Sequence, residues 1–182
     1  MNDLRQQVVD SRGLLKKIEL SIPGFRGYRL REDIRDADNL LRTYLADQLD
    51  SGVQKKLIRA REIFSKSLEL DLLNDIGELI NMNKGLVAKI RHAEHGYSGI
   101  SPQYRVDENE LNQMYDFDNN LIEFIRMLQS KSELLVDQTG KKEISDIKTS
   151  FNDIRTEIEM VDELLSKRRF QLKGIIDRNT GA

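Results

Sequence analysis

Apolar residues in the C-terminal part of the chain recur at alternating steps of three and four positions. The run consists of Ile144, Ile147, Phe151, Ile154, Ile158, Val161, Leu165, Leu172 and Ile175, with Arg168 as its single polar member. A repeat of 3.5 residues is typical of the buried seam between packed helices, and it extends here over more than four heptads. We expect the stem of Arg168 to pack in the seam while its charged head reaches water, with a register-setting or binding role as the alternative.

A second seam precedes this one. Its members are Leu111, Tyr115, Asp118, Ile122, Ile125, Gln129, Ser132 and Val136, and the stripe is widened by Met114, Leu121, Leu128 and Leu135. Asp107 followed by Glu110 predicts a capping box at the start of the helix, and Gly140 predicts its end. Because the connection to the next seam is short, we expect an antiparallel helical hairpin.

Two helices alone leave half of each apolar stripe uncovered. We expect the first half of the chain to cover it through Leu57, Phe64, Ile76 and Leu86, because intramolecular cover carries no entropic cost of association. This favours a monomer. A homodimer with isologous contacts is the alternative.

The first half is also helical but less regular. Leu4, Val8, Ser11, Leu15, Ile18 and Ile22 predict an N-terminal helix that Pro23 stops. A second helix is expected from Tyr28 to Leu49, ended by Ser51-Gly52. A third region runs from Val53 to about His95, broken near Ser65–Ser67 or around Asn81–Gly85.

Together these patterns predict an all-α chain, an elongated antiparallel helical bundle with a long C-terminal coiled-coil hairpin. We expect a single helical domain over residues 1–182. Its N-terminal helices and two Gly/Pro loops occupy residues 1–106, and the hairpin occupies residues 107–178.

Composition adds mainly exclusions. The formal net charge of −2 argues against a nucleic-acid binder, although residues 1–60 carry 12 Lys+Arg against 9 Asp+Glu. The absence of cysteine removes disulfides and zinc–thiolate sites. The start MNDLRQQ has no apolar signal segment, and no stretch approaches about 18 consecutive apolar residues. We therefore expect a cytoplasmic protein.

Catalytic and metal motifs are missing from the sequence. A di-metal carboxylate site in a helical bundle needs Glu-x-x-His on two helices, but Lys89 and His92 stand three residues before the only histidines, His92 and His95. No strand–turn–helix pattern supports a nucleophilic triad, and GFRG and GYSG are too short for phosphate loops. We expect no metal, no cofactor and no enzymatic activity.

The stretches IPGFRGY and HGYSGISPQY interrupt the helices, and each contains a proline, two glycines and a Gly-Tyr pair. They are the best candidates for a binding site. Arginines cluster at the start of the second helix, where exposed N–H groups already favour anions. The candidate binding residues are Arg26, Tyr28, Arg29, Arg31, Arg35 and Tyr97. The alternative is a solvated face in which neighbouring acids pair with these arginines. We also expect both loops to dock on neighbouring helices through Phe25, Tyr28, Tyr97 and Tyr104.

The segments IPGFRGYRLREDIRDADNLLR and KIRHAEHGYSGISPQYRVDENELNQMYDFDNNL resemble the two signature stretches of an uncharacterised prokaryotic family of all-helical, coiled-coil-like proteins. The resemblance covers most of the chain and implies an all-α fold with no assigned activity or cofactor. It also implies an association with membrane-associated scaffold proteins of the flotillin-like or band-7 type. The resemblance therefore tilts the expectation toward a role in binding such a scaffold partner.

The sequence thus predicts a non-enzymatic helical interaction or scaffold protein with a protein partner and no nucleic-acid partner. The alternative is a peripheral membrane-surface or anion-binding protein that uses the arginine cluster at the start of the second helix.

Overall fold

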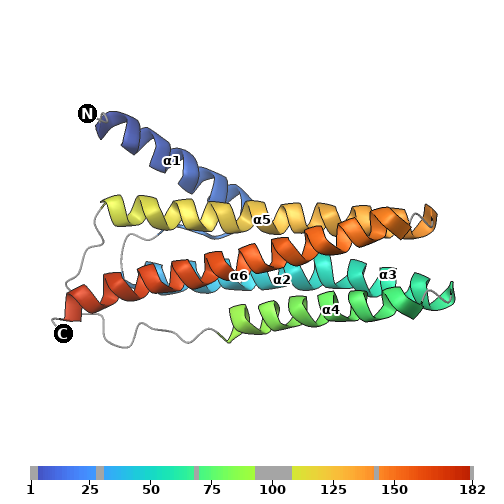
Figure 1. Ribbon diagram of the computed structural model, residues 1–182. Helices are drawn as coiled ribbons and strands as arrows, with labels where there is room; N and C mark the ends of the chain where they lie inside the picture. Colours follow the sequence, from blue (N-terminus) through green and yellow to red (C-terminus); the bar gives the residue numbers. More distant parts are fainter. Residues whose placement is uncertain (1–3, 28–30, 68–69, 93–107, 142–143, 181–182) are drawn as a thin grey trace. The chain divides into compact units, whose positions relative to one another are not determined.

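The computed structural model describes residues 4–27, 31–67, 70–92, 108–141 and 144–180, and the regular structure in these ranges is entirely helical (Figure 1). In chain order the elements are α1 (Leu4–Ser21), α2 (Arg31–Gln48), a π-helical turn η1 (Leu49–Gln54), α3 (Lys55–Lys66), α4 (Leu70–Arg91), α5 (Glu108–Lys141) and α6 (Ile144–Thr180). The predicted all-α helical bundle is confirmed.

The chain divides into two compact units. Unit 1 combines Met1–Tyr44, Ala93–Ile122 and Leu164–Ala182, and unit 2 combines Leu45–His92 and Glu123–Glu163. Helices α2, α5 and α6 therefore each contribute residues to both units. The expected division between N-terminal helices and hairpin, at 106/107, lies outside the described residues.

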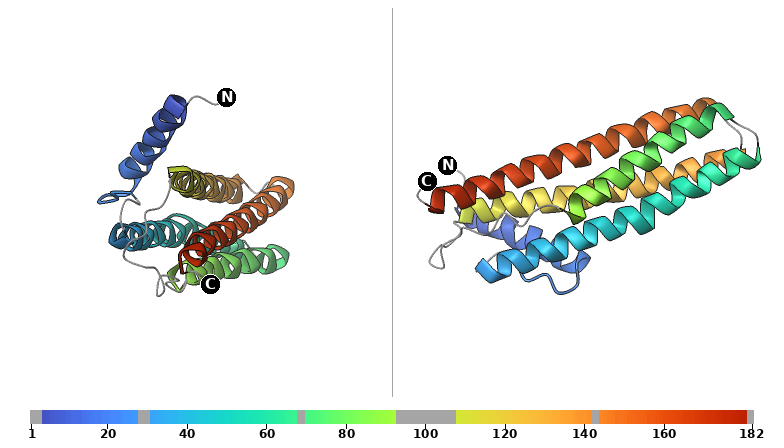
Figure 2. Two further views of the ribbon diagram at one scale, coloured as in Figure 1. Left: turned by 90° about the vertical axis from the view of Figure 1, so that its left-hand side faces the viewer. Right: turned by 90° about the horizontal axis from the view of Figure 1, so that it is seen from below.

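Within unit 2, α5 and α6 pack antiparallel. Lys131 Nζ lies 2.5 Å from Glu157 Oε2, and Ser150 Oγ donates to Gln138 Oε1 at 2.7 Å. A step of seven residues forward along α5 thus matches a step of seven residues back along α6. This register confirms the predicted hairpin direction, which can also be followed in Figure 2.

Polar pairs show that the helices of unit 2 form a closed four-helix arrangement. The π turn contacts α4 through Gln54 and Asn83, and α3 contacts α5 through Lys56 and Glu133. On the other two sides, α5 contacts α6 through Lys131 and Glu157. Helix α4 contacts α6 through two ion pairs, Lys89 with Asp162 and Glu78 with Arg155. The two hairpins, α3–α4 and α5–α6, therefore cover each other's apolar faces.

The core of unit 2 lies between these helices. Leu57, Phe64, Ile76 and Leu86 are all buried, as expected for residues that cover the C-terminal hairpin. The rings of Phe64 and Phe151 meet edge to face with centroids 5.9 Å apart, which joins α3 to α6. The hairpin is therefore covered by the first half of the same chain.

The prediction that Ser51-Gly52 ends the second helix is wrong. Helical structure continues without a gap from Arg31 to Lys66, and Leu49–Gln54 form a π-helical turn. The buried residues Leu45, Leu49, Val53 and Leu57 explain this turn, since they follow one another at steps of four. In an α-helix of 3.6 residues per turn each such step rotates by about 40°, and the wider π turn compensates for the drift.

Gly52 serves close packing rather than chain reversal. A Cβ at Gly52 would collide with the side-chain amide of Gln129 on α5. Because glycine has no Cβ, the Gln129 side chain can reach the backbone of the π turn. Gly52 therefore marks a close contact between two helical segments and not the end of a helix.

In unit 1, the turn after α1 follows the expectation from its proline and glycines. Ile22 and Phe25 are buried, and Gly24 and Gly27 have φ of 86° and 85°, a region that favours glycine. A Cβ at Gly27 would lie 2.5 Å from Tyr115 Oη, so the turn approaches α5 closely. The predicted docking of Phe25 is confirmed. The docking predicted for Tyr28, Tyr97 and Tyr104 concerns residues outside the described ranges.

Other helix ends differ by small amounts from the predictions. The break expected near Ser65–Ser67 is confirmed, while α4 runs through Asn81–Gly85 without interruption. The end of α5 predicted at Gly140 is correct to within one residue, since the helix ends at Lys141, but Gly140 is itself helical rather than the first residue beyond the helix. Asp107 of the predicted capping box lies outside the described residues.

Candidate functional site

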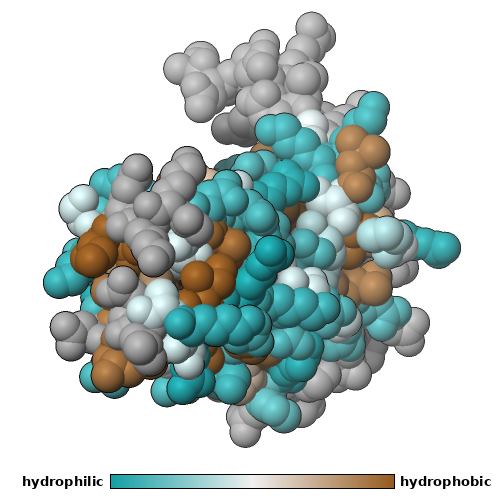
Figure 3. All heavy atoms as spheres, turned by 90° about the vertical axis from the view of Figure 1, so that its right-hand side faces the viewer, coloured by the Kyte–Doolittle hydropathy of each residue, from teal (hydrophilic) through white to brown (hydrophobic). Residues whose placement is uncertain are grey.

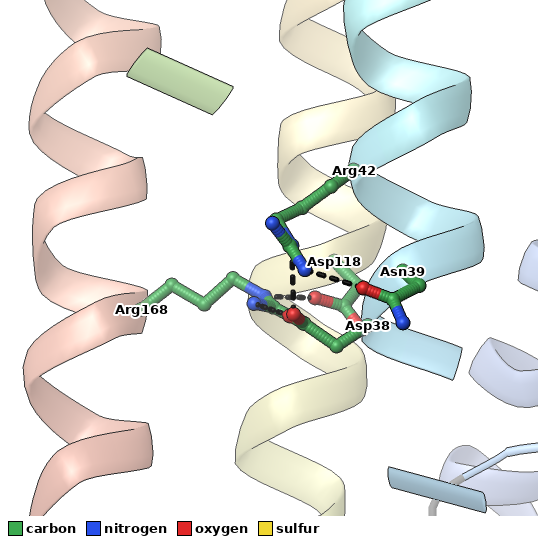
Figure 4. Close-up of polar contacts among 5 residues, drawn as sticks. All are labelled: Asp38, Asn39, Arg42, Asp118 and Arg168. Carbon is green, nitrogen blue, oxygen red and sulfur yellow. Dashed lines mark hydrogen bonds and ion pairs between the residues drawn. The ribbon is translucent and has the colours of Figure 1, made fainter. Parts of the chain in front are cut away.

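Arg168 lies at the centre of the most deeply buried charged cluster that the structure describes (Figure 4). Only 5% of the residue is exposed, so the expectation that its head reaches water is wrong. The stem does lie in the seam of α6, as predicted. The head, however, points inward to carboxylates on two neighbouring helices of unit 1.

The cluster forms a chain of alternating charges. Arg168 Nε donates to Asp118 Oδ1 on α5 at 2.6 Å, and Arg168 Nη1 donates to Asp38 Oδ1 on α2 at 2.6 Å. The other Asp38 oxygen accepts from Arg42 Nε at 2.8 Å, and Arg42 Nη2 donates to Asn39 Oδ1 at 2.5 Å. One guanidinium thereby links three helices.

Local structure places each of these groups. Asp38 and Arg42 are four residues apart on α2, the spacing at which helical side chains meet. Asp118 occupies a seam position of α5 and is fully buried, so its carboxylate points toward the neighbouring helices. Arg168 occupies the corresponding kind of position in α6. The same heptad pattern that buries apolar residues elsewhere therefore buries these charges.

The arrangement neutralises itself. Two guanidiniums face two carboxylates, and each carboxylate accepts at least one charge-assisted hydrogen bond from an arginine. Among the described residues, the positive and negative charges of the cluster are therefore equal in number. The chemical capacity of the cluster is to fix the register of α2, α5 and α6, because sliding any helix would strand a buried charge.

A second buried polar site surrounds the π turn of unit 2. The backbone carbonyl of Gln48 accepts from Gln129 Nε2 at 3.1 Å, and the carbonyl of Leu49 accepts from Asn83 Nδ2 at 3.4 Å. Asn83 Nδ2 also donates to Gln54 Oε1 at 2.8 Å. Side-chain amides from α4 and α5 therefore supply donors to carbonyls at the start of the π turn.

Three buried polar atoms in unit 2 lack a hydrogen-bond partner among the described residues. They are Gln54 Nε2, Asn83 Oδ1 and Glu157 Oε1. The first two belong to side-chain amides that already bond to each other, because Asn83 Nδ2 donates to Gln54 Oε1. Gln54 in the π turn and Asn83 in α4 are both buried.

The binding residues predicted from the sequence are only partly described. Arg26 is exposed beyond the end of α1. Arg31 and Arg35 lie in the first turns of α2, and the structure describes their backbone only. Tyr28, Arg29 and Tyr97 lie outside the described residues.

Sequence reasoning missed the partners of Arg168. Asp118 and Arg168 each interrupt an apolar seam, and two opposite charges in facing seams are a signal for a buried pair. Asp38 and Arg42 carried a weaker signal, the i,i+4 spacing within a helix whose surface is densely charged.

Within the described ranges, no group of three or more histidine, aspartate or glutamate side chains is placed to hold a metal ion. In the same ranges, no helix is both long enough and apolar enough to cross a membrane. Comparisons with protein families, with characterised proteins and with solved structures found no match to this chain.

Proposed function

We propose that this chain is a non-enzymatic helical interaction protein, a scaffold or adaptor that works in the cytoplasm. The observation that carries the proposal is a set of apolar side chains on the outside of the α5–α6 pair in unit 2. Met127, Leu134 and Met160 are 43%, 52% and 44% exposed. Exposed apolar groups gathered on one face are typical of protein–protein contact.

The two buried polar sites support the same proposal. The Arg168 cluster and the amides of the π turn stabilise particular helix registers, and neither presents a nucleophile or a general base to solvent. A rigid helical framework with outward apolar side chains suits a protein whose work is to hold a partner. The resemblance of its two loop segments to a family that accompanies membrane-associated scaffolds points the same way.

Crosslinking in the native cell tests the proposal. We expect affinity-tagged protein, crosslinked before lysis, to recover one partner protein in near-stoichiometric amount by quantitative mass spectrometry. An untagged strain is the control. Recovery of nothing above that control contradicts the proposal.

A second candidate function is attachment to an anionic membrane surface through unit 1. Leu20 at the end of α1 is 79% exposed, and Lys16 and Lys17 lie one turn before it, with exposed Arg26 beyond. An apolar side chain flanked by cations is the pattern of an interfacial helix.

Sedimentation with phosphatidylserine vesicles at low salt tests this candidate. We expect the protein to pellet with vesicles, and the substitutions Leu20→Glu and Lys16→Glu together to keep it in the supernatant. Protein that stays in the supernatant without these substitutions contradicts membrane attachment.

A further inference from the structure

We propose that the outer face of the α5–α6 pair in unit 2 binds a basic amphipathic helix of a partner protein. This inference rests on the proposed interaction function and names the chemistry of the partner. We call the surface the α5–α6 outer face and define it by Met127, Leu134, Asp137, Asp153 and Met160.

Helical geometry places the apolar members together. Met127 and Leu134 are seven residues apart on α5, so they lie two turns apart on one side of the helix. Each precedes a buried leucine, Leu128 or Leu135, and therefore points about 100° away from that buried side chain. Met160 lies three residues beyond Glu157, whose contact with Lys131 fixes the register of α6 against α5. Met160 is therefore level with the α5 turn that carries Met127.

The charge of this face is negative. Asp137 lies one turn beyond Leu134, and Asp153 lies two turns before Met160. Both aspartates are exposed, and neither has an ion-pair partner in the described part of the chain. The nearby cation Lys131 already pairs with Glu157. A partner with lysine or arginine beside its apolar residues would complement this face.

The same charges disfavour two other occupants. A second copy packed through this face would bring its aspartates toward those of the first copy, which costs free energy. An anionic membrane would be repelled for the same reason. A basic protein segment is the occupant that gains from both the apolar side chains and the acids.

The α5–α6 outer face offers three exposed apolar side chains, Met127, Leu134 and Met160, which suits one helix rather than a broad interface. Figure 3 shows a different side, on which α5 ends and α6 begins, and there the apolar areas form separate patches between hydrophilic ones. A helix with anchors at i, i+3, i+4 and i+7 needs only a narrow apolar strip. The flexible, polarisable side chains of Met127 and Met160 can adapt to such anchors.

A synthetic peptide tests the chemistry directly. The probe is a fluorescein-labelled peptide of about 18 residues, five helical turns, with leucines along one face and lysines elsewhere. A scrambled peptide of identical composition has the same charge without an apolar face. By fluorescence anisotropy we expect the amphipathic peptide to bind at least about tenfold more tightly. Equal binding of the two peptides overturns the proposal.

Matched variants locate the binding site. Met127→Gln combined with Met160→Gln removes apolar surface without changing the charge of the face, and it is expected to weaken peptide binding by about tenfold or more. Ile58→Gln changes a similarly exposed apolar residue on α3 and is expected to leave binding unchanged. Circular dichroism and urea unfolding should show both variants folded, since all three positions are exposed. Weakening by Ile58→Gln as large as that by the double variant overturns the assignment to this face.

The native-cell experiment separates this inference from the proposed function. Loss of the crosslinked partner in the Met127→Gln, Met160→Gln variant supports the face. A partner that is recovered equally with that variant overturns the face while the interaction function stands. Two other results also overturn the inference. One is self-association of the protein through this face. The other is binding of the folded protein to anionic vesicles, if the double variant abolishes that binding.

Discussion

At the scale of single residues, the Arg168 cluster shows how much depends on complete pairing. Burying a charge costs several kcal/mol after relaxation, and the attraction of an opposite charge offsets this only when geometry and hydrogen bonding are good. Here Arg168 meets both Asp38 and Asp118 at 2.6 Å. The cluster is therefore stable as a set and vulnerable to the loss of any one member.

Asp118→Ala should accordingly destabilise the protein by about 3–5 kcal/mol, because it leaves part of the Arg168 guanidinium buried without its partner. Urea unfolding at neutral pH measures the change. The control is Asp162→Ala, which breaks a solvent-exposed pair with Lys89 and should cost about 1 kcal/mol or less. Equal effects of the two substitutions would show that the cluster contributes no more than a surface pair.

Glu133 offers a prediction about pH. Its hydrogen bond and charge interaction with Lys56 lower the pKa of this exposed carboxyl below its ordinary value. The stabilisation from the pair is therefore present above the unfolded-state pKa of Glu133, and is lost as pH falls through the lower folded-state pKa.

We expect the Glu133 carboxyl to titrate in NMR at lower pH than glutamates without a cation nearby, and Lys56→Met to raise its pKa toward the ordinary value. The effect on stability should be small, because the carboxylate is exposed to water. An unchanged Glu133 titration in Lys56→Met would refute the assigned cause.

At the scale of helices, regular heptads made α5 and α6 predictable, whereas the π turn was not. Seam residues such as Ile154 and Ile125 repeat at 3.5-residue spacing, and they are buried as expected. The four-residue steps through Leu49 and Val53 fit neither a heptad nor a helix end. The contact that explains them, Gln129 against Gly52, joins segments far apart in sequence. No local propensity encodes such a contact.

The candidate sites show the same limit. Arg168 and Asp118 were visible as polar interruptions of apolar seams, but the sequence does not say that they face each other or that Asp38 completes the cluster. Those facts depend on the register of three packed helices. Polar residues inside seams can therefore be recognised from sequence, while their partners require the fold.

Two glycines in helices test the role assigned to Gly52. In an open helix Gly→Ala stabilises by about 1 kcal/mol, and Gly85 in α4 has nothing near its missing Cβ. We expect Gly85→Ala to raise the free energy of unfolding. Gly52→Ala should lower it, because the methyl group displaces the Gln129 amide from the π turn.

Gln129→Ala combined with Gly52→Ala completes the comparison. With the colliding amide removed, the added methyl group should cost less than it does beside Gln129. Thermal unfolding of the unsubstituted protein, Gly52→Ala, Gln129→Ala and the double variant measures the coupling between the two positions. Stabilisation by Gly52→Ala in the presence of Gln129 would show that the approach of the two residues is not tight.

At the scale of the molecule, the closed ring of contacts in unit 2 bears on whether the hairpin needs a second chain. Ile154 and Ile158 on α6 are buried, and α3 and α4 of the same chain supply the covering residues Leu57 and Ile76. Cover from within the chain has no entropic cost of association. The oligomeric state is thus a prediction with a clear structural basis: a folded monomer.

Ile154→Asp should then unfold the protein rather than dissociate an assembly. An unpaired carboxylate in the core of unit 2 combines lost apolar burial with uncompensated desolvation, and we expect destabilisation above about 3 kcal/mol. Circular dichroism should report loss of helix, and light scattering of the unsubstituted protein should give the mass of one chain. Met160→Asp, on the exposed side of the same helix, is the control and should leave both values unchanged. If Ile154→Asp instead keeps its helical signal while the mass falls by half, the interior that Ile154 occupies is shared between two chains, and the hairpin is covered by a partner copy.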